Sequence, residues 1–204
     1  MTEAVQSRRR DPERRQRILD AAAGLVSQRG YHDVGMIEIG AAAGITGSGI
    51  YRHFDGKSDV LVTMFERVID DLSAGAGEVA ESQAQPLAAL RALIQGQIRF
   101  VVDDRAVAQV YYNEIANLPA DDRRRLRRKQ RLYLEEWVHQ LAALWPGASD
   151  AELRARVHAT IAAIQSVLRY QSGLAADQLE RLIAGIAELI LVGTDEGRGD
   201  GLPG

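Results

Sequence analysis

The sequence predicts an all-α protein, and three observations support this prediction. Apolar residues recur at spacings of three and four over most of the 204 residues, which is the period of an amphipathic helix. No segment alternates apolar and polar residues as a half-buried strand would. Prolines and glycines separate the periodic segments, as at Pro86, Pro119 and Pro146. Since 46% of the residues are hydrophobic, the chain is long enough and apolar enough to fold as one or two domains.

The first helix is expected from Pro12 to about Gly30. Proline suits the first turn of a helix and glycine suits its end, and Ile18, Ala22 and Leu25 recur between them at helical spacing. Residues 1–11 contain three consecutive arginines and too few apolar residues to pack. We predict a flexible basic arm there, which either contacts DNA through phosphates or the minor groove or remains a solvated tail.

Residues 36–54 predict a helix-turn-helix, a DNA-reading device. Ile39 and Ala43 face a small core at i, i+4 spacing. Gly44 then supplies the positive φ of a sharp helix end, and Ile45 returns to the core after it. The alternative is a helical hairpin whose polar side contacts only water.

The second helix of this device is expected from residue 47 to residue 54, with Ile50 and Phe54 four apart and directed inward. Thr46 or Ser48 is expected to cap it. Small side chains near its start permit close approach to the major groove, so that Arg52 meets a base edge while its neighbours contact phosphates. The residues predicted to face DNA are Thr46, Gly47, Ser48, Tyr51, Arg52 and His53.

Lys57 is expected to open the next helix, where its ammonium and the first-turn N–H groups suit a further DNA phosphate. Apolar residues follow at helical spacing from Val60 to Leu72 and then fade. Five more helices are predicted over residues 86–101, 107–118, 121–144, 149–171 and 176–192. The expected organisation is an arm (1–11), a DNA-binding domain (12–58), a helical ligand-binding and dimerisation domain (59–193) and a disordered tail (194–204).

The N-terminal quarter of the chain resembles the TetR family of transcriptional regulators over residues 14–68. Its landmarks are Ile18, Ala21, Ala22, Gly30, Tyr31, Ile39, Gly44, Tyr51, Phe54, Lys57 and Leu61. Two features depart from the family pattern. Val34-Gly35 stands where relatives often have two threonines, and Gly40 stands where alanine is usual, which should weaken that helix by up to about 1 kcal/mol.

The resemblance implies a homodimer that binds a palindromic operator, acting as a repressor. In the family, the last two helices form a four-helix bundle with their copies in a second subunit. Here the corresponding apolar stripe is Val157, Ile161, Ile164, Leu168, Leu179, Leu182, Ile186 and Leu189. The alternative is that both helices bury these residues within one chain.

A small-molecule pocket is expected between the middle helices, because aromatic residues concentrate there beside a few polar groups. The candidates are Phe100, Tyr111, Tyr112, Asn113, Tyr133, Trp137, His158 and Gln165. The segment around residues 107–131 also resembles TetR-type regulators of lipid and steroid catabolism that sense acyl-coenzyme A thioesters. That resemblance implies that coenzyme phosphates meet arginines among Arg123, Arg124, Arg125, Arg127, Arg128 and Arg131, although a solvated helix face explains the same run.

Composition narrows the other function classes. Residues 1–58 contain 9 Lys+Arg against 7 Asp+Glu, whereas the remainder contains 16 against 21. Only the N-terminal part therefore has the positive net charge that attracts the phosphates of DNA. The absence of cysteine excludes thiol chemistry and agrees with a reducing cytoplasm. No membrane segment is apparent, the four histidines lack metal-site spacing, and no catalytic motif or cofactor fingerprint is present. We expect no metal, no cofactor and no enzymatic activity; the alternatives are an all-α enzyme with a helical hairpin, and a DNA-binding regulator without a ligand.

Overall fold

The computed structural model describes residues 12–81 and 85–193, and within these ranges it contains helices and no strand. The all-α prediction is therefore confirmed for the described residues. The elements are α1 (Pro12–Arg29), α2 (Met36–Ala42), η1 (Gly47–Arg52), α3 (Lys57–Glu81), α4 (Pro86–Val102), α5 (Arg105–Glu114), η2 (Ile115–Asn117), α6 (Ala120–Leu144), α7 (Asp150–Gln165), η3 (Ser166–Arg169) and α8 (Ala176–Val192). The predicted arm and tail lie outside the described residues.

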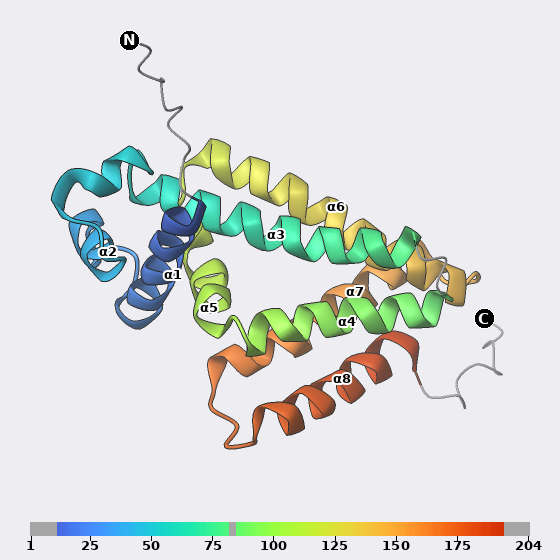
Figure 1. The fold of residues 1–204 in the computed structure, drawn as a ribbon. Helices are drawn as coiled ribbons and strands as arrows, with labels where there is room; N and C mark the ends of the chain where they lie inside the picture. The colour runs from blue at the N-terminus through green and yellow to red at the C-terminus, as the bar shows by residue number, and fades with distance from the viewer. Residues whose placement is uncertain (1–11, 82–84, 194–204) are drawn as a thin grey trace, which may run out of the picture.

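The molecule has a small helical head at one end of an elongated helical body (Figure 1). We call α1, α2 and η1 the head, and α3 to α8 the body. The α1 helix packs against both α3 and α5, and these contacts join the two parts. Its buried side chains include Ile18, Ala22 and Val26, which recur at i, i+4, i+8, and Leu25 beside them is half-buried.

The α3 helix extends from the head far along the body (Figure 1). The sequence indicated an end soon after Leu72, where glycine and alanine replace large apolar residues, but the helix continues to Glu81. Its packing against α4 and α6 explains the difference, because tertiary burial, here of Ala76, supports helical segments of weak intrinsic propensity.

The body is built around α4, which packs against α3, α6 and α8. Leu90, Ile94 and Ile98 form its buried stripe. On its outer side, the Arg91 guanidinium donates hydrogen bonds to both carboxylate oxygens of Glu188 on α8, with N–O distances of 2.5 to 3.1 Å. Both side chains are partly exposed, so this pair joins α4 to α8 but adds little stability.

The α7 helix ends before residue 171, where the sequence predicted its end. Ser149 caps its start by accepting a hydrogen bond from the Glu152 N–H at 3.2 Å, but regular α-helix stops at Gln165 and a 3₁₀ turn follows. Arg105 on α5 explains this end, because its guanidinium binds the carbonyl oxygens of Val167 at 2.9 Å and Tyr170 at 3.1 Å. Those bonds replace the helical hydrogen bonds that the carbonyls lose.

Candidate DNA interface and ligand cavity

The turn between α2 and η1 has the geometry that the sequence predicted. Gly44 has a φ of 71°, which glycine adopts without steric cost, and Ile45 packs against the core. Gly40 has a packing role as well. A Cβ placed there would lie 3.3 Å from Cβ of Ile50, so the glycine lets η1 approach α2 closely.

The reading segment is a 3₁₀ helix over Gly47–Arg52 and not the α-helix expected to residue 54. Thr46 occupies its N-cap position, but the structure gives the cap no side-chain hydrogen bond. The side-chain cap predicted from Thr46 or Ser48 is therefore wrong, and both residues are exposed. The inward residues agree with the prediction, since Ile50 and Phe54 are fully buried.

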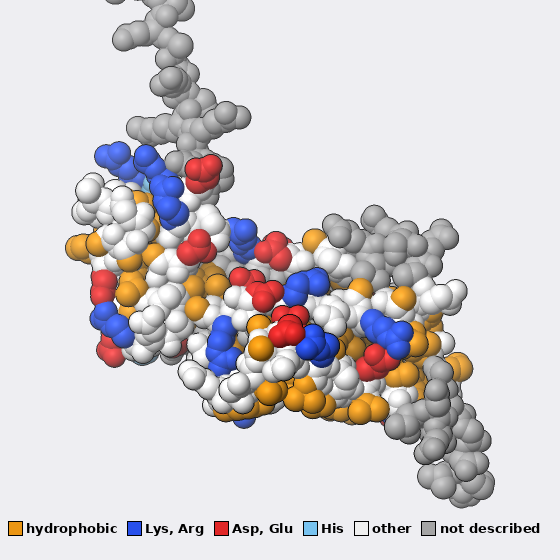
Figure 2. All heavy atoms as spheres, turned by 60° about the horizontal axis from the view of Figure 1, so that its bottom comes forward, with side chains coloured by type: hydrophobic (Ala, Val, Ile, Leu, Met, Phe, Trp, Pro, Cys, Tyr) orange, Lys and Arg blue, Asp and Glu red, His pale blue; other side chains and the backbone are white. Residues whose placement is uncertain are grey.

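The residues predicted to face DNA lie on the outer surface of the head. Thr46, Gly47, Ser48 and Arg52 are exposed, Tyr51 is 51% exposed, and His53 is half-buried. Basic side chains also gather at this end of the molecule in Figure 2. This arrangement leaves polar and aromatic groups free to contact an external partner.

Arg15 of α1 contacts the two residues that follow the reading segment, His53 and Phe54. Its guanidinium donates a 2.7 Å hydrogen bond to the carbonyl of His53 and lies 4.2 Å from the ring centroid of Phe54. This cation–π contact and hydrogen bond fix the C-terminal end of η1 on α1. Sequence reasoning missed Arg15, because its partners are 38 residues away and no local spacing reveals them.

Lys57 occupies a different environment from the predicted one. Its ammonium donates to the carbonyls of Tyr31 and, at 2.8 Å, Val34, and it lies 4.2 Å from the centroid of the Tyr31 ring. These acceptors satisfy the cation inside the head, in the turn that follows α1. The predicted phosphate contact would have to compete with them.

We therefore expect Lys57→Met to destabilise the head. The substitution keeps the aliphatic stem and removes three hydrogen bonds from the charged ammonium, to the carbonyls of Tyr31, His32 and Val34, which should lower the free energy of unfolding by about 2 kcal/mol. Urea unfolding measures this change, and Lys129→Met is the control. Among the described residues Lys129 pairs with the exposed Asp70 alone, so its loss should cost less than about 1 kcal/mol. Unchanged stability together with a flatter salt dependence of DNA binding would instead support the phosphate role.

A cavity of about 450 Å³ lies at the junction of head and body. Its walls come from α1, α3, α4, α5 and α6, and its polar residues are Gln16, Asp20, Arg67, Asp71, Arg99, Asp104 and Tyr133. Leu19, Met64, Leu93 and Phe100 are among its apolar residues. Such a volume and a mostly helical, partly apolar wall are typical of a small-molecule site.

The eight predicted ligand residues separate into several groups. Phe100 and Tyr133 line the junction cavity. Tyr111 and Trp137 belong to the buried core, and burial raises the pKa of Tyr111 to about 12. The predicted role of Asn113 is wrong for this cavity, because its side chain is exposed and is not part of the wall.

The other predicted ligand residues have roles elsewhere. A buried polar network links Tyr112 to the cavity wall through Gln97, whose amide donates to the Tyr112 hydroxyl at 3.1 Å and accepts from the Tyr133 hydroxyl at 3.2 Å. Gln165 hydrogen-bonds Tyr112 and lowers its pKa, but burial dominates and raises that pKa. His158 lies outside the cavity, at a groove between α6 and α7.

The rim of the junction cavity contains more acidic than basic groups. Burial raises the pKa of Asp104, and the neighbouring carboxylates of Asp103, Asp71 and Asp20 raise it further, while Arg67 opposes them. On α1, the Gln16 amide donates to Asp20 at 2.7 Å, and its Oε1 atom is buried without a hydrogen-bond partner. A bound molecule that donates a hydrogen bond would satisfy this oxygen.

The arginine run of α6 does not line the junction cavity, contrary to the expectation that it meets a ligand there. Arg123 binds the carbonyl of Leu118 at 2.6 Å, and Arg125 pairs with Glu66 at 2.7 Å. Arg124 pairs with Asp121. Arg127 and Arg131 line the separate groove between α6 and α7. The helical spacing of the run thus distributes its charges over different faces of α6.

The predicted dimer stripe also divides into an inner and an outer set. Val157, Ile164 and Leu179 are buried within the chain, where α7 packs against both α6 and α8, so their assignment to an interface is wrong. The exposed apolar residues are Leu182 at 50%, Ile186 at 38% and Leu189 at 57%. Ile161 and Leu168 are half-buried, so their exposure is intermediate between those of the two sets. Hydrophobic side chains gather along the lower edge of the body in Figure 2.

The described residues form neither a metal-binding cluster nor a membrane-spanning helix. Among residues 12–81 and 85–193, no group of three or more histidines and carboxylates has the arrangement of a metal site. None of the helices in the described part of the chain is long and apolar enough to cross a membrane.

Two family models match the chain in succession. Residues 18–64 match the model described as bacterial regulatory proteins of the tetR family, and residues 83–168 match the tetracyclin repressor-like C-terminal domain. The first match covers the head and the start of α3, and the second covers the body from before α4 to η3. Head and body therefore match one family, in the order in which that family joins them.

Individual relatives give the same assignment. The HTH-type transcriptional repressor KstR2 of Rhodococcus jostii is 28% identical over 141 residues, which are 69% of this chain and 66% of that protein. The chain spans about half to two thirds of the length of the KstR2 and FasR relatives that it matches.

Solved structures with low sequence identity share the fold. The regulator AibR, in complex with isovaleryl coenzyme A and operator DNA, has a TM-score of 0.72 at 20% identity, covering 88% of this chain and 97% of that one. FadR of Bacillus subtilis, in complex with stearoyl-CoA, has a TM-score of 0.70 at 20% identity, covering 88% and 98%. The two family models, which match residues 18–64 and 83–168, show that the chain belongs to the TetR family of bacterial transcriptional regulators.

Proposed function

We propose that the chain is a ligand-responsive transcriptional repressor that binds a palindromic operator as a homodimer. The observation that carries the proposal is the two-sided character of the reading segment. Its inner residues Ile50 and Phe54 are fully buried against the head, while Thr46, Tyr51 and Arg52 are exposed together. A polar face held on a rigid apolar core is what major-groove recognition requires.

The dimer is proposed to form through the exposed apolar residues of α8 and the neighbouring face of α7. On α7 the residues exposed beside them include Ala155, Ala159 and Ala162, whose small side chains allow helices to approach closely. A two-fold axis through this surface would place two heads on one side of the DNA. Their reading segments would then meet half-sites about one DNA turn, roughly 34–36 Å, apart.

The junction cavity offers a physical connection between ligand and DNA. Its wall includes Gln16 and Leu19 of α1, the helix on which the reading segment rests. At the other end of α5, the Glu114 carboxylate accepts a 3.2 Å hydrogen bond from the Tyr31 N–H of the head and a 2.6 Å bond from Asn117. A ligand that fits one position of α1 and α5 better than another shifts the population of head positions accordingly.

An acyl-coenzyme A thioester is the proposed class of ligand. AibR and FadR, which share the fold, are described in complex with isovaleryl coenzyme A and stearoyl-CoA. In this chain the apolar wall around Leu93 and Phe100 would accommodate an acyl group. Arg67 and Arg99 are the basic residues of the cavity wall, so they replace the α6 arginines as candidate contacts for the polar part.

The test is a selection of DNA sites from random duplexes by the full-length chain, followed by mobility shift with the selected site. We expect a palindromic site, and we expect octanoyl-CoA or palmitoyl-CoA to release it while free coenzyme A and the free fatty acids do not. Equal release by free coenzyme A, or none by any thioester, would exclude this ligand class and leave a DNA-binding regulator. Failure to select any duplex would exclude the regulator itself.

A further inference from the structure

A second groove, of about 410 Å³, lies between α6 and α7 and shares no residue with the junction cavity. Its residues are Arg127, Gln130, Arg131, Leu134, Glu135, Val138, Arg154, Val157 and His158. Three of the nine are arginines and only one is acidic. The groove is therefore a basic feature on a body that contains more Asp+Glu than Lys+Arg.

Two of the arginines are available to an external anion. Arg127 and Arg131 are exposed, and the described part of the chain gives neither of them an ion pair, although Arg124, Arg125 and Lys129 of the same run are all paired. They are four residues apart on α6, which places their Cβ atoms about 5–6 Å apart on one face of the helix.

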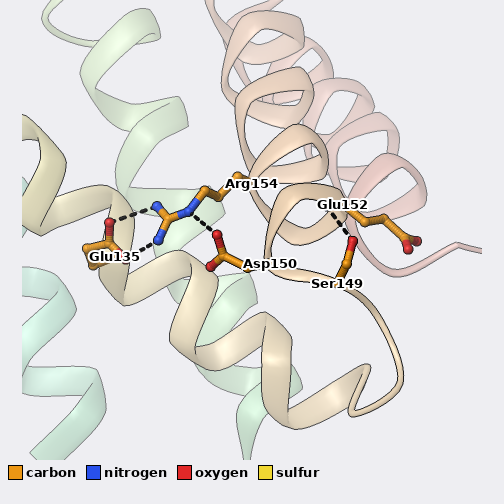
Figure 3. Close-up of polar contacts among 5 residues, drawn as sticks. All are labelled: Glu135, Ser149, Asp150, Glu152 and Arg154. Atoms are coloured by element: carbon orange, nitrogen blue, oxygen red, sulfur yellow. Dashed lines mark hydrogen bonds and ion pairs between the residues drawn. The ribbon is translucent and has the colours of Figure 1, made fainter.

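The acidic residue of the groove is already paired with an arginine. Figure 3 shows the Arg154 guanidinium between Glu135 of α6 and Asp150 of α7, with distances of 2.7 and 2.8 Å to the Glu135 oxygens and 2.7 Å to Asp150. Hydrogen bonding to Arg154 lowers the pKa of Glu135, but Arg154 is shared by two carboxylates, so Glu135, Asp150 and Arg154 together have one net negative charge. Arg127 and Arg131 add two positive charges that no ion pair among the described residues occupies, so the groove with its rim remains net positive.

The floor of the groove is apolar. Val138 and Val157 are 8% and 1% exposed, and Leu134 is half-buried. Guanidinium groups beside such a low-dielectric surface attract an anion more strongly than they would in open water.

We propose that this groove binds a ligand with two linked phosphate groups, in a site separate from the junction cavity. Arginine forms bidentate hydrogen bonds with phosphate oxygens, and two guanidiniums one turn apart suit two adjacent phosphates. His158 on α7 lines the groove and offers a further nitrogen donor. This site goes beyond the proposed function, because it requires neither DNA binding nor an occupant of the junction cavity. The ligand is either an inorganic diphosphate or the diphosphate of a larger organic molecule.

Calorimetry on the full-length chain, with inorganic pyrophosphate and free coenzyme A as probes, tests the site. We expect saturable binding with one site per chain, and we expect Arg127→Ala/Arg131→Ala to weaken it at least about tenfold, because hydrogen bonds to charged groups are lost. Binding of coenzyme A tighter than pyrophosphate assigns the organic ligand, and equal or weaker binding assigns the inorganic one.

Arg128→Ala is the matched control. Arg128 belongs to the same run, is exposed and unpaired among the described residues, but does not line the groove. It should leave both affinities within about twofold, since a single exposed charge contributes little. An equal loss in the control would show a diffuse charge effect and overturn the proposal, as would the absence of saturable binding. Competition by duplex DNA for the same arginines would assign them to DNA and overturn it as well. The mass of each variant in solution checks that assembly is unchanged.

Discussion

Arg52→Ala is expected to abolish specific operator binding while leaving the fold and the assembly intact. The guanidinium is exposed at the end of η1, and no ion pair within the described residues occupies it. An arginine contact with a base edge contributes about 1–3 kcal/mol of discrimination. A two-fold dimer loses the contact in both half-sites, so affinity for the selected operator should fall by roughly 30-fold to 10⁴-fold.

The measurement is a comparison of the selected operator with a scrambled duplex at one fixed salt concentration. Arg52→Ala should bind both duplexes with nearly the same affinity, because phosphate contacts elsewhere in the head are kept. Arg128→Ala removes the same charge from the body and should preserve the preference for the operator. A variant that loses affinity equally for both duplexes would place Arg52 at phosphates and contradict base readout. Thermal unfolding should be unchanged, since an exposed side chain is removed.

The architecture of the head could be predicted from local sequence signals. The positive φ of Gly44 and the inward pair Ile50 and Phe54 follow from turn chemistry and helical spacing. The type of the reading helix did not follow, because only Ile50 of its six residues is buried, and one buried position cannot distinguish a period of 3.0 residues from one of 3.6.

Contacts between distant segments could not be predicted in the same way. Nothing near Lys57 in the sequence indicates that the turn after α1 offers it carbonyl oxygens, and Arg15 gives no local sign of its bond to His53. Both depend on how α1 crosses the head. An exposed lysine before a helix suggests a phosphate contact, whereas the fold brings protein acceptors to the same ammonium.

The ligand cavity shows a related difference. Aromatic clustering in the middle helices suggested the pocket, but Tyr111 and Trp137 pack in the core. Aromatic side chains bury a large apolar area, so clustering alone does not distinguish a core from a pocket. The cavity lies nearer the head and includes Gln16 and Asp20 of α1. Composition alone cannot show that residues of α1, more than 40 positions before α3 ends, line the same pocket as residues of the body.

Ile186→Asp is the second change with a large expected effect, and it should separate the dimer. Ile186 is 38% exposed at the centre of the apolar surface of α8, between Leu182 and Leu189. In a two-fold interface the substitution introduces an aspartate in each copy, and an unpaired buried carboxylate costs several kcal/mol. The dissociation constant of the dimer should therefore rise at least about 100-fold. Sedimentation velocity should show the mass fall toward that of one 22.3 kDa chain.

Leu132→Asp separates this effect from a general response to a new surface charge. Leu132 is 65% exposed on α6, so the control introduces the same carboxylate at an apolar site outside the proposed interface and should leave the mass unchanged. Because α7 packs against α8 within one chain, with Ile164 and Leu179 buried, the Ile186 variant should remain helical and folded. It should also lose operator affinity, since one head can no longer hold the second in register with its half-site. A folded Ile186→Asp protein that keeps the mass of two chains would show that the dimer interface is not on α8. The expected spacing between the two half-sites of the operator would then be wrong as well.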